Sequence, residues 1–216
     1  MLTIQKTQAV KKFPSKVKVF FEDDAYIMSV NTFAHFALYD GKEITQEELG
    51  EILSHDLHSD LYERAVNYIS YSPRTEYQVR EYIQKYLKKS GVFELNIDHE
   101  KLTNEIIEKL KEYKYINDRD YAELFVKSRL KNKPKPRYFL LSELLSKGID
   151  KELANEILDV LMPDSFEILK RVYEKKYRDE PITFEDKKKI SFLQRKGFLW
   201  DDISKLVNSF SEKNDD

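Results

Sequence analysis

The sequence predicts a mainly α-helical protein: three tandem three-helix repeats in an elongated, curved array, preceded by a short N-terminal β-hairpin region. The first observation behind this prediction is a pattern that the chain repeats. A Lys-Gly pair follows a segment of helically spaced apolar residues at Gly148 and again at Gly197, 49 residues later. Ile157 and Leu206 keep the same offset, which indicates a repeated structural unit. At both glycines a helix can end in the left-handed conformation before a second amphipathic helix begins.

Composition is the second observation. The 216 residues are 41% apolar, which is enough for a sizeable core, while 35% charged residues and only five glycines favour long solvated helices over tight sheets. The formal net charge of −2 excludes the basic field of a protein that coats DNA with its whole surface. Contacts with phosphates must therefore come from local patches.

The absence of cysteine excludes disulfides, Cys-based zinc sites and thiol chemistry, and it is typical of a reducing compartment. The sequence has no apolar run of about 18 residues. It also opens without the basic and then apolar segments of a signal peptide. We therefore expect a cytoplasmic protein with no membrane partner.

The N-terminal region has the pattern of a β-hairpin. Residues 16–21 alternate polar and apolar side chains, and after a turn residues 25–30 resume an extended run. A capping box at Thr45 and Glu48 then predicts a short helix toward Leu53, because each of the two residues satisfies an exposed backbone donor of the other.

From about Leu61 onward, apolar side chains recur with the helical period. Thr75 begins a second capping box, and Asn117 and Asp164 are natural joints, since Asn and Asp cap helix starts. The segment 88–99 breaks the periodicity and predicts a loop or insertion. These signals divide the chain into an N-terminal region at 1–58, repeats at 59–117, 118–163 and 164–210, and an acidic tail at 211–216.

The strongest electrostatic signal lies between Leu124 and Ile149, where seven basic residues stand against one acid, Glu143. Two prolines keep the middle of this segment extended, so its cations could follow a phosphate backbone or an acidic protein groove. The alternative is an ordinary solvated face with a loop. The candidate binding residues of this segment are Lys127, Arg129, Lys131, Lys133, Lys135 and Arg137.

Smaller basic groups lie in the other repeats: Arg74 and Arg80 in the first, and Lys175 and Lys176 in the third, where acids are interleaved. We add these four residues to the candidate binding surface. Most of the fourteen tyrosines lie on helical stripes and are expected in the core with their hydroxyls at its edge. Tyr71 and Tyr138 instead lie next to basic linkers, where they could stack on bases.

Nothing in the sequence assembles a catalytic group. His55 and His58 have helical spacing, but no third ligand follows from the pattern, so a helix-end surface is the better interpretation than a metal site. No phosphate-binding glycine loop and no nucleophile elbow occurs. We expect a protein that is not an enzyme and that needs no metal or cofactor.

Three stretches resemble the RecX family, the bacterial regulators of the RecA recombinase. Residues 115–129 are similar to the family's signature stretch, residues 70–76 with Val79 and Arg80 to its other recognisable stretch, and residues 147–149 to its repeat ending. Their order and spacing agree with the family over roughly residues 61–161. Residues 88–99 depart from it, since a short Lys-Gly ending would be expected there.

The resemblance implies three tandem three-helix repeats and a small cytoplasmic protein, which we expect to be a monomer. It also implies a partner, the RecA filament on single-stranded DNA, whose growth, ATP hydrolysis and strand exchange the protein would modulate, most simply by inhibition. The processes concerned are DNA repair, recombination and the SOS response. The family has no catalytic residues to transfer, but it carries the basic character at Arg74, Arg80, Lys127 and Arg129.

Two functional hypotheses follow. The first is a filament regulator that acts by binding alone, with single-stranded DNA as a partner and double-stranded DNA as a further candidate. The alternative is a helix-turn-helix-like DNA-binding protein, because three-helix units can present that geometry. A recognition helix needs Arg, Asn or Gln on one exposed face, and residues 151–162 and 200–210, the third helices of two repeats, contain no arginine.

Overall fold

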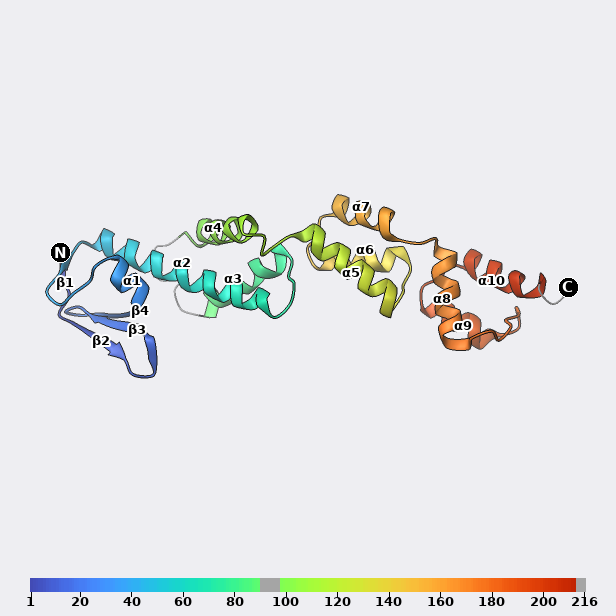
Figure 1. Cartoon of the computed structure of the whole chain (residues 1–216), viewed down its shortest axis with the longest axis horizontal. Helices are drawn as coiled ribbons and strands as arrows, with labels where there is room; N and C mark the ends of the chain where they lie inside the picture. The colour runs from blue at the N-terminus through green and yellow to red at the C-terminus, as the bar shows by residue number, and fades with distance from the viewer. Residues whose placement is uncertain (90–97, 213–216) are drawn as a thin grey trace. The chain divides into compact units, whose positions relative to one another are not determined.

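A computed structural model describes residues 1–89 and 98–212 of the chain (Figure 1). The chain divides into two compact units. The first comprises Met1–Pro73 and Val79–Ile116, and the second comprises Arg74–Gln78 and Asn117–Asp216. Ten helices and two small antiparallel sheets form in the described part, which confirms the mainly helical class and the N-terminal β-structure.

The N-terminal sheet is wider than the expected hairpin. Strands β3 (Phe13–Phe20) and β4 (Ala25–Ser29) pair antiparallel, with Phe20 opposite Ala25, and this confirms the hairpin. Strand β2 (Lys6–Val10) adds a third strand on the other side of β3. The alternation of β2 is weak, with three exposed side chains among its five, so the sequence pattern did not reveal it. The short strands β1 (Leu2–Thr3) and β5 (Glu43–Ile44) form a separate ladder.

One face of the three-stranded sheet supplies a core. Val17, Val19 and Met28 are buried there together with Leu49 and Ile52 of helix α2 (Gln46–Ser70). Helix α1 (Val30–His35) packs beside them (Figure 1).

The capping box that starts α2 is confirmed, because the backbone N–H of Glu48 donates to Thr45 Oγ1 at 3.1 Å and that of Thr45 to Glu48 Oε2 at 2.7 Å. The short helix predicted toward Leu53 is wrong, however. α2 runs for 25 residues to Ser70, and the expected boundary at residue 58 falls inside it. The polar stretch in its middle stays helical because Leu57 is buried.

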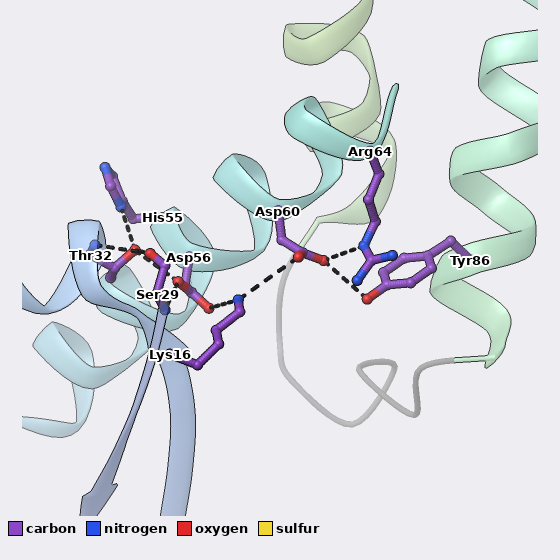
Figure 2. A network of polar contacts seen from close by, with 8 residues as sticks. All are labelled: Lys16, Ser29, Thr32, His55, Asp56, Asp60, Arg64 and Tyr86. Carbon is purple, nitrogen blue, oxygen red and sulfur yellow. Dashed lines mark hydrogen bonds and ion pairs between the residues drawn. The ribbon is translucent and has the colours of Figure 1, made fainter. Parts of the chain in front are cut away.

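Asp56 of α2 ties the sheet to the helices (Figure 2). Its carboxylate accepts from the backbone N–H of Ser29 at 2.7 Å and from Thr32 Oγ1 at 2.8 Å, and Lys16 Nζ lies 3.9 Å away. Thr32 is fully buried, so this carboxylate is the partner that allows its hydroxyl to leave water.

Asp60, one turn later, makes the second set of contacts in Figure 2. It accepts from Arg64 Nε at 2.7 Å and from the hydroxyl of Tyr86 at 3.0 Å, and Lys16 Nζ lies 3.8 Å from it. Burial, and then the negative charge of Asp60, raise the pKa of the Tyr86 phenol. The two carboxylates thus join β3, α1, α2 and α3 (Glu76–Lys89) into one body.

The helical part of the first unit packs α2 and α3 against α4 (His99–Glu112), with Leu61, Val79, Ile83, Ile106 and Leu110 in its core. Ahead of α3, Thr75 and Gln78 form the predicted capping box through reciprocal bonds of 3.1 and 3.2 Å. Of the expected loop at 88–99, Lys88 and Lys89 end α3, while Asp98 caps α4 and His99 begins it. Residues 90–97 lie outside the described residues, as do residues 213–216 of the predicted acidic tail.

The second unit contains two three-helix layers. The first layer is α5 (Asp118–Asn132), α6 (Arg137–Ser146) and α7 (Lys151–Leu161). The second is α8 (Ser165–Tyr177), α9 (Lys187–Arg195) and α10 (Trp200–Glu212). Asn117 caps α5 and Asp164 caps α8 through side-chain bonds to backbone N–H groups, which confirms both predicted joints.

Gly148 and Gly197 end α6 and α9 in the predicted way. Their φ angles are 78° and 90°, in the left-handed region. The N–H of Ile149 donates to the carbonyl of Leu144 at 3.2 Å, and the residue after Gly197 makes the equivalent bond at the same distance. Both ends are therefore Schellman motifs, which satisfy the last carbonyls of each helix.

At each of these glycines an aromatic residue occupies the place of a side chain. A Cβ on Gly148 would lie 2.2 Å from the Cβ of Tyr77, and one on Gly197 would lie 2.2 Å from Cε2 of Phe139. Next to the first contact, Thr75 Oγ1 donates to the carbonyl of Lys147 at 2.6 Å. The segment 74–78 is thereby fixed to the end of α6 within the second unit.

We expect Gly148→Ala to lower the free energy of unfolding of the second unit by about 2 kcal/mol or more. A left-handed alanine costs about 1–2 kcal/mol, and the overlap with Tyr77 adds to this. Gly50→Ala is the matched control: Gly50 is exposed on α2 with open space around it, so this change should stabilise by about 0.5–1 kcal/mol. Urea unfolding followed by circular dichroism and by the fluorescence of Trp200, the single tryptophan, measures both. Equal effects at the two glycines would contradict the packing described here.

Candidate binding surface

The predicted basic segment spans the end of α5, a connection and the start of α6, and its cations differ in what they contact. Lys131 and Lys133 are exposed, and neither side chain meets a carboxylate within the part of the chain that the structure describes. Lys127 pairs with Glu123 one turn earlier, with Nζ and Oε2 2.9 Å apart. Such an exposed pair contributes little to stability.

Glu143, the single acid of this segment, holds two of its cations. Arg129 Nε donates to Oε2 at 2.8 Å and Lys135 Nζ to Oε1 at 2.6 Å. Partial burial alone would raise the pKa of the Glu143 carboxyl, but the hydrogen bond from Lys135 and the charge of Arg129 outweigh it, so the pKa is lowered. The guanidinium of Arg129 also lies over the ring of Phe125, 4.8 Å from its centre. These contacts fix the direction of the connection between α5 and α6.

The side chain of Arg137 contacts α7 instead of the other cations of the segment. Its Nη2 donates to Asp159 Oδ1 at 2.8 Å and to Asn155 Oδ1 at 2.9 Å. It lines a mainly apolar cavity of about 480 Å³ together with Tyr138 and Leu199. Arg137 is therefore a contact between helices rather than part of a free cationic surface.

Between the two layers of the second unit lies a second hollow, of about 580 Å³, which we call the basic groove. Phe139, Val172 and Phe192 supply its apolar surface, with Asn132 and Pro134 at its side. No Asp or Glu is among the lining residues that the structure describes. The cations that line it are Lys133, Lys135, Lys175, Lys176, Arg195 and Lys196.

Aromatic rings position several of these cations. Lys176 Nζ lies 3.8 Å from the centre of the Phe192 ring and Lys196 Nζ 5.6 Å from the same centre, while Lys135 lies 5.4 Å from that of Phe139. Rings attract cations through their π faces without neutralising them. A concentration of positive charge in a partly enclosed hollow favours a polyanionic partner.

The structure thus brings together four predicted site residues from two different repeats: Lys133, Lys135, Lys175 and Lys176. Six others do not line the basic groove. They are Lys127, Arg129, Lys131, Arg137, Arg74 and Arg80.

Of those six, Arg80 belongs to the first unit, where its Nη1 donates to Asn104 Oδ1 at 2.6 Å, and Arg74 is half-buried just before α3. The two tyrosines considered for base stacking also lie outside the groove. Tyr71 is 87% exposed, and Tyr138 is 52% exposed and stacks on Phe139.

Sequence reasoning missed Arg195 and Lys196. A usable signal existed, because Lys196 follows Lys147 by the same 49 residues that separate Gly197 from Gly148. The Lys-Gly pair was used only to identify the repeat, and its lysine at the end of α9 was not counted among the candidate binding residues. The rings of the groove had no such signal, since they also belong to apolar stripes.

His55 lies in an aromatic group: its ring stacks on His35 with centres 4.6 Å apart, and its Nδ1 is 3.4 Å from Thr32 Oγ1. Among residues 1–89 and 98–212, no three His, Asp or Glu side chains come together as metal ligands. None of the described helices is both long and apolar enough to cross a membrane.

Comparison with known proteins gives consistent matches. The family model for the second three-helix domain of RecX matches residues 117–158, which are α5, α6 and most of α7. The chain is 30% identical to the regulatory protein RecX of Bacillus velezensis and 33% identical to that of Bacillus licheniformis, in both cases over 99% of this chain and 79% of the relative. The RecX protein of Clostridium tetani is 30% identical over 95% of this chain and 93% of its own length.

Two solved structures are also similar. A crystal structure of regulatory protein RecX matches with a TM-score of 0.62 and 23% identity over 97% of this chain and all of its own, a likeness of fold. The crystal structure of RecX from Lactobacillus salivarius matches with a TM-score of 0.56 and 28% identity, over 73% of this chain and 98% of that one.

We expect Glu143→Gln to lower the free energy of unfolding by about 1 kcal/mol at pH 7, because two partly buried cations lose their shared charge. The folded-state pKa of Glu143 lies below the unfolded value, so this stabilisation is present above about pH 4.5 and is lost as pH falls through the folded pKa. The difference between parent and variant should therefore shrink as the pH is lowered toward and below the folded-state pKa of Glu143.

The control is Glu123→Gln, which breaks the exposed pair with Lys127 and should change stability by less than about 0.5 kcal/mol. Urea unfolding followed by Trp200 fluorescence at pH 7 and pH 3 measures both variants. A deficit of Glu143→Gln that is the same at the two pH values would contradict the ionic role of Glu143.

Proposed function

The chain belongs to the RecX family of regulatory proteins, and on that premise we propose that it regulates the RecA recombinase by binding the filament that RecA forms on single-stranded DNA. It acts without catalysis, as a monomer in the cytoplasm. Its effect is to inhibit filament growth, ATP hydrolysis and strand exchange during DNA repair and recombination.

The observation that carries this proposal is the basic groove. Six cations meet there from the α5–α6 connection, α8 and the end of α9, and no carboxylate lines the groove within the described chain. Lys133 and Arg195 have no side-chain partner among the described residues, so their charges are available to a ligand. A polyanion that enters the groove replaces counterions and water, and the release of those counterions favours binding.

The groove suits an inhibitor that acts by occupancy. It lies where two layers of helices meet, so a ligand there touches α8 and α9 as well as the connection between α5 and α6. Contacts from several elements hold a bound strand or acidic surface at more than one point. A site occupied in this way on a filament is closed to the next recombinase subunit, and this limits growth.

The alternative function, a helix-turn-helix-like DNA-binding protein, is less well supported. A recognition helix presents its readers on one exposed face. The basic side chains within the third helices of the second unit are Lys151 in α7 and Lys205 in α10. The cations converge instead in a hollow between layers, where side chains can meet phosphates or carboxylates but not base edges in a duplex groove.

A three-site groove variant tests the proposal: Lys133→Gln, Arg195→Gln and Lys196→Gln. All three side chains are exposed, so folding should change by less than about 0.5 kcal/mol per site. The measurement is RecA ATPase on single-stranded DNA as the protein is titrated in. We expect the parent to lower the rate and the variant to need about 10-fold more protein for half-inhibition, or more.

The matched control removes three positive charges elsewhere: Lys101→Gln, Lys151→Gln and Lys205→Gln, all exposed and outside the groove. It should inhibit like the parent. Lys131→Gln separates the groove from the linear basic segment, because Lys131 lies in the segment but does not line the groove. A groove variant that inhibits as well as the parent, or a parent that accelerates ATP hydrolysis, would contradict the proposal.

Filament binding over a salt series then identifies the kind of ligand. If the three cations contact phosphates of a single strand, the slope of log affinity against log salt should flatten by about 0.7 for each phosphate that the variant no longer neutralises. If they contact acidic side chains of the recombinase, screening still weakens binding, but the slope need not follow that count.

A further inference from the structure

A second cationic surface lies in the first unit, on the N-terminal sheet. Residues 1–21 contain five lysines and no Asp or Glu, a segregation as complete as that of the basic segment in the second repeat. The lysines are Lys6, Lys11, Lys12, Lys16 and Lys18. The acids Glu22, Asp23 and Asp24 follow directly in the β3–β4 turn, so the local excess of positive charge is confined to β2, β3 and the turn between them.

The pairing of the strands puts two of these lysines, Lys6 and Lys18, on one face. Because alternate side chains of a strand point to opposite faces, Val17 and Val19 enter the core while Lys18 and Phe20 face away from it. The register places Gln8 and Ile27 on either side of Lys18, and Lys6 opposite Phe20. We call Lys6, Gln8, Lys18, Phe20 and Ile27 the open face of the sheet.

The open face carries one aromatic ring among its cations, that of Phe20. Lys18 Nζ lies 4.8 Å from the centre of the Phe20 ring, and Ile27 is 55% exposed. At the turn between β2 and β3, Lys12 lies 5.9 Å from the centre of the Phe13 ring, which is also 55% exposed. Figure 1 shows this β2–β3 hairpin extending beyond α1 and α2, so its tip is open to a ligand.

Most of these lysines lack a carboxylate. Lys6, Lys11, Lys12 and Lys18 form no ion pair within the described residues, while Lys16 points to Asp56 and Asp60 at 3.9 and 3.8 Å (Figure 2). Lys16 therefore anchors the sheet on α2, and the others remain available. Exposed lysines without acids repel one another, and a polyanion removes that repulsion.

We infer that the open face and the hairpin tip bind single-stranded nucleic acid, with Lys11, Lys12 and Lys18 on its phosphates and Phe13 stacked on a base. The lysines require only an anion, but exposed rings beside them select a ligand whose bases are unpaired and able to stack. A duplex keeps its bases stacked internally, and an acidic peptide without aromatic residues, such as polyglutamate, has no ring to stack on Phe13. The preformed sheet, fixed to α2 by Asp56, presents the cations and the ring without further ordering.

The test uses the full chain without any recombinase and a fluorescein-labelled 20-nucleotide oligothymidine, followed by anisotropy over a salt series. Lys11→Gln, Lys12→Gln and Lys18→Gln are introduced together into the groove variant, so that the basic groove does not mask the result. We expect affinity at 0.1 M salt to fall by up to about 100-fold and the salt slope to flatten by about 2, from about 0.7 for each of three phosphate contacts. The control in the same background is Lys101→Gln, Lys151→Gln and Lys205→Gln. These changes should lower the affinity and flatten the salt slope less than the three changes on the sheet do.

Phe13→Leu tests stacking separately from charge. It keeps an apolar side chain and all five lysines, so the salt slope should stay the same while affinity falls about 5-fold or more. In the parent, a 5-iodouracil in the strand should cross-link on irradiation to the peptide that contains Phe13 or Phe20.

Several outcomes would overturn the inference. These are a sheet variant that binds as well as its background, a reduction in affinity no greater than that of the control, and competition by duplex DNA or polyglutamate as strong as that by oligothymidine. The ATPase assay of the basic groove has no part in this test. The failure of one proposal is therefore distinguishable from the failure of the other.

Discussion

At Gly148 and Gly197 the backbone turns left-handed and a ring-bearing residue occupies the space that a Cβ would need. This close approach controls much of the second unit. Phe139 can reach Gly197 only because that position has no side chain, and the same ring forms part of the basic groove. The glycine thus sets the distance between α6 and α9, and this distance decides whether cations from two layers share one hollow. The absence of a side chain at Gly197 thus allows Phe139 to take its place in the lining of the basic groove.

Much of the helical fold followed from the sequence because its signals are local. Capping boxes at Thr45 and Thr75 and the glycine at the end of α6 each satisfy backbone groups within a few residues, so the pattern and the structure agree. The continuation of α2 past Leu53 was not predictable in this way, since it depends on the burial of Leu57 and on distant partners of Asp56 and Asp60. Strand β2 was missed for the same reason, because it is defined by its pairing with β3 and not by an alternation of its own side chains.

The binding surface was predictable in composition but not in arrangement. A count of charges identified Lys133 and Lys135, yet the count could not separate cations that face a ligand from those held by a single carboxylate. Glu143 takes Arg129 and Lys135 together, which leaves less free charge in the segment than its sequence indicates. On the N-terminal sheet the reverse holds: five lysines scattered along 21 residues gather only when β2 and β3 pair. The folded structure thus leaves fewer free cations in the basic segment than its sequence indicates, and it brings lysines together on the N-terminal sheet that are separated in the sequence.

Helix α2 contributes to two cores. Its first turns pack on the sheet, and its later turns pack with α3 and α4. An unbroken helix of 25 residues is about 37 Å long at 1.5 Å per residue. Asp56 and Asp60 clamp it near its midpoint to β3, α1 and α3. Within the first unit the helix therefore has no joint between its two ends. A displacement of the sheet cannot be absorbed by bending in the middle of α2, so it must move together with the residues that α2 packs against on α3 and α4.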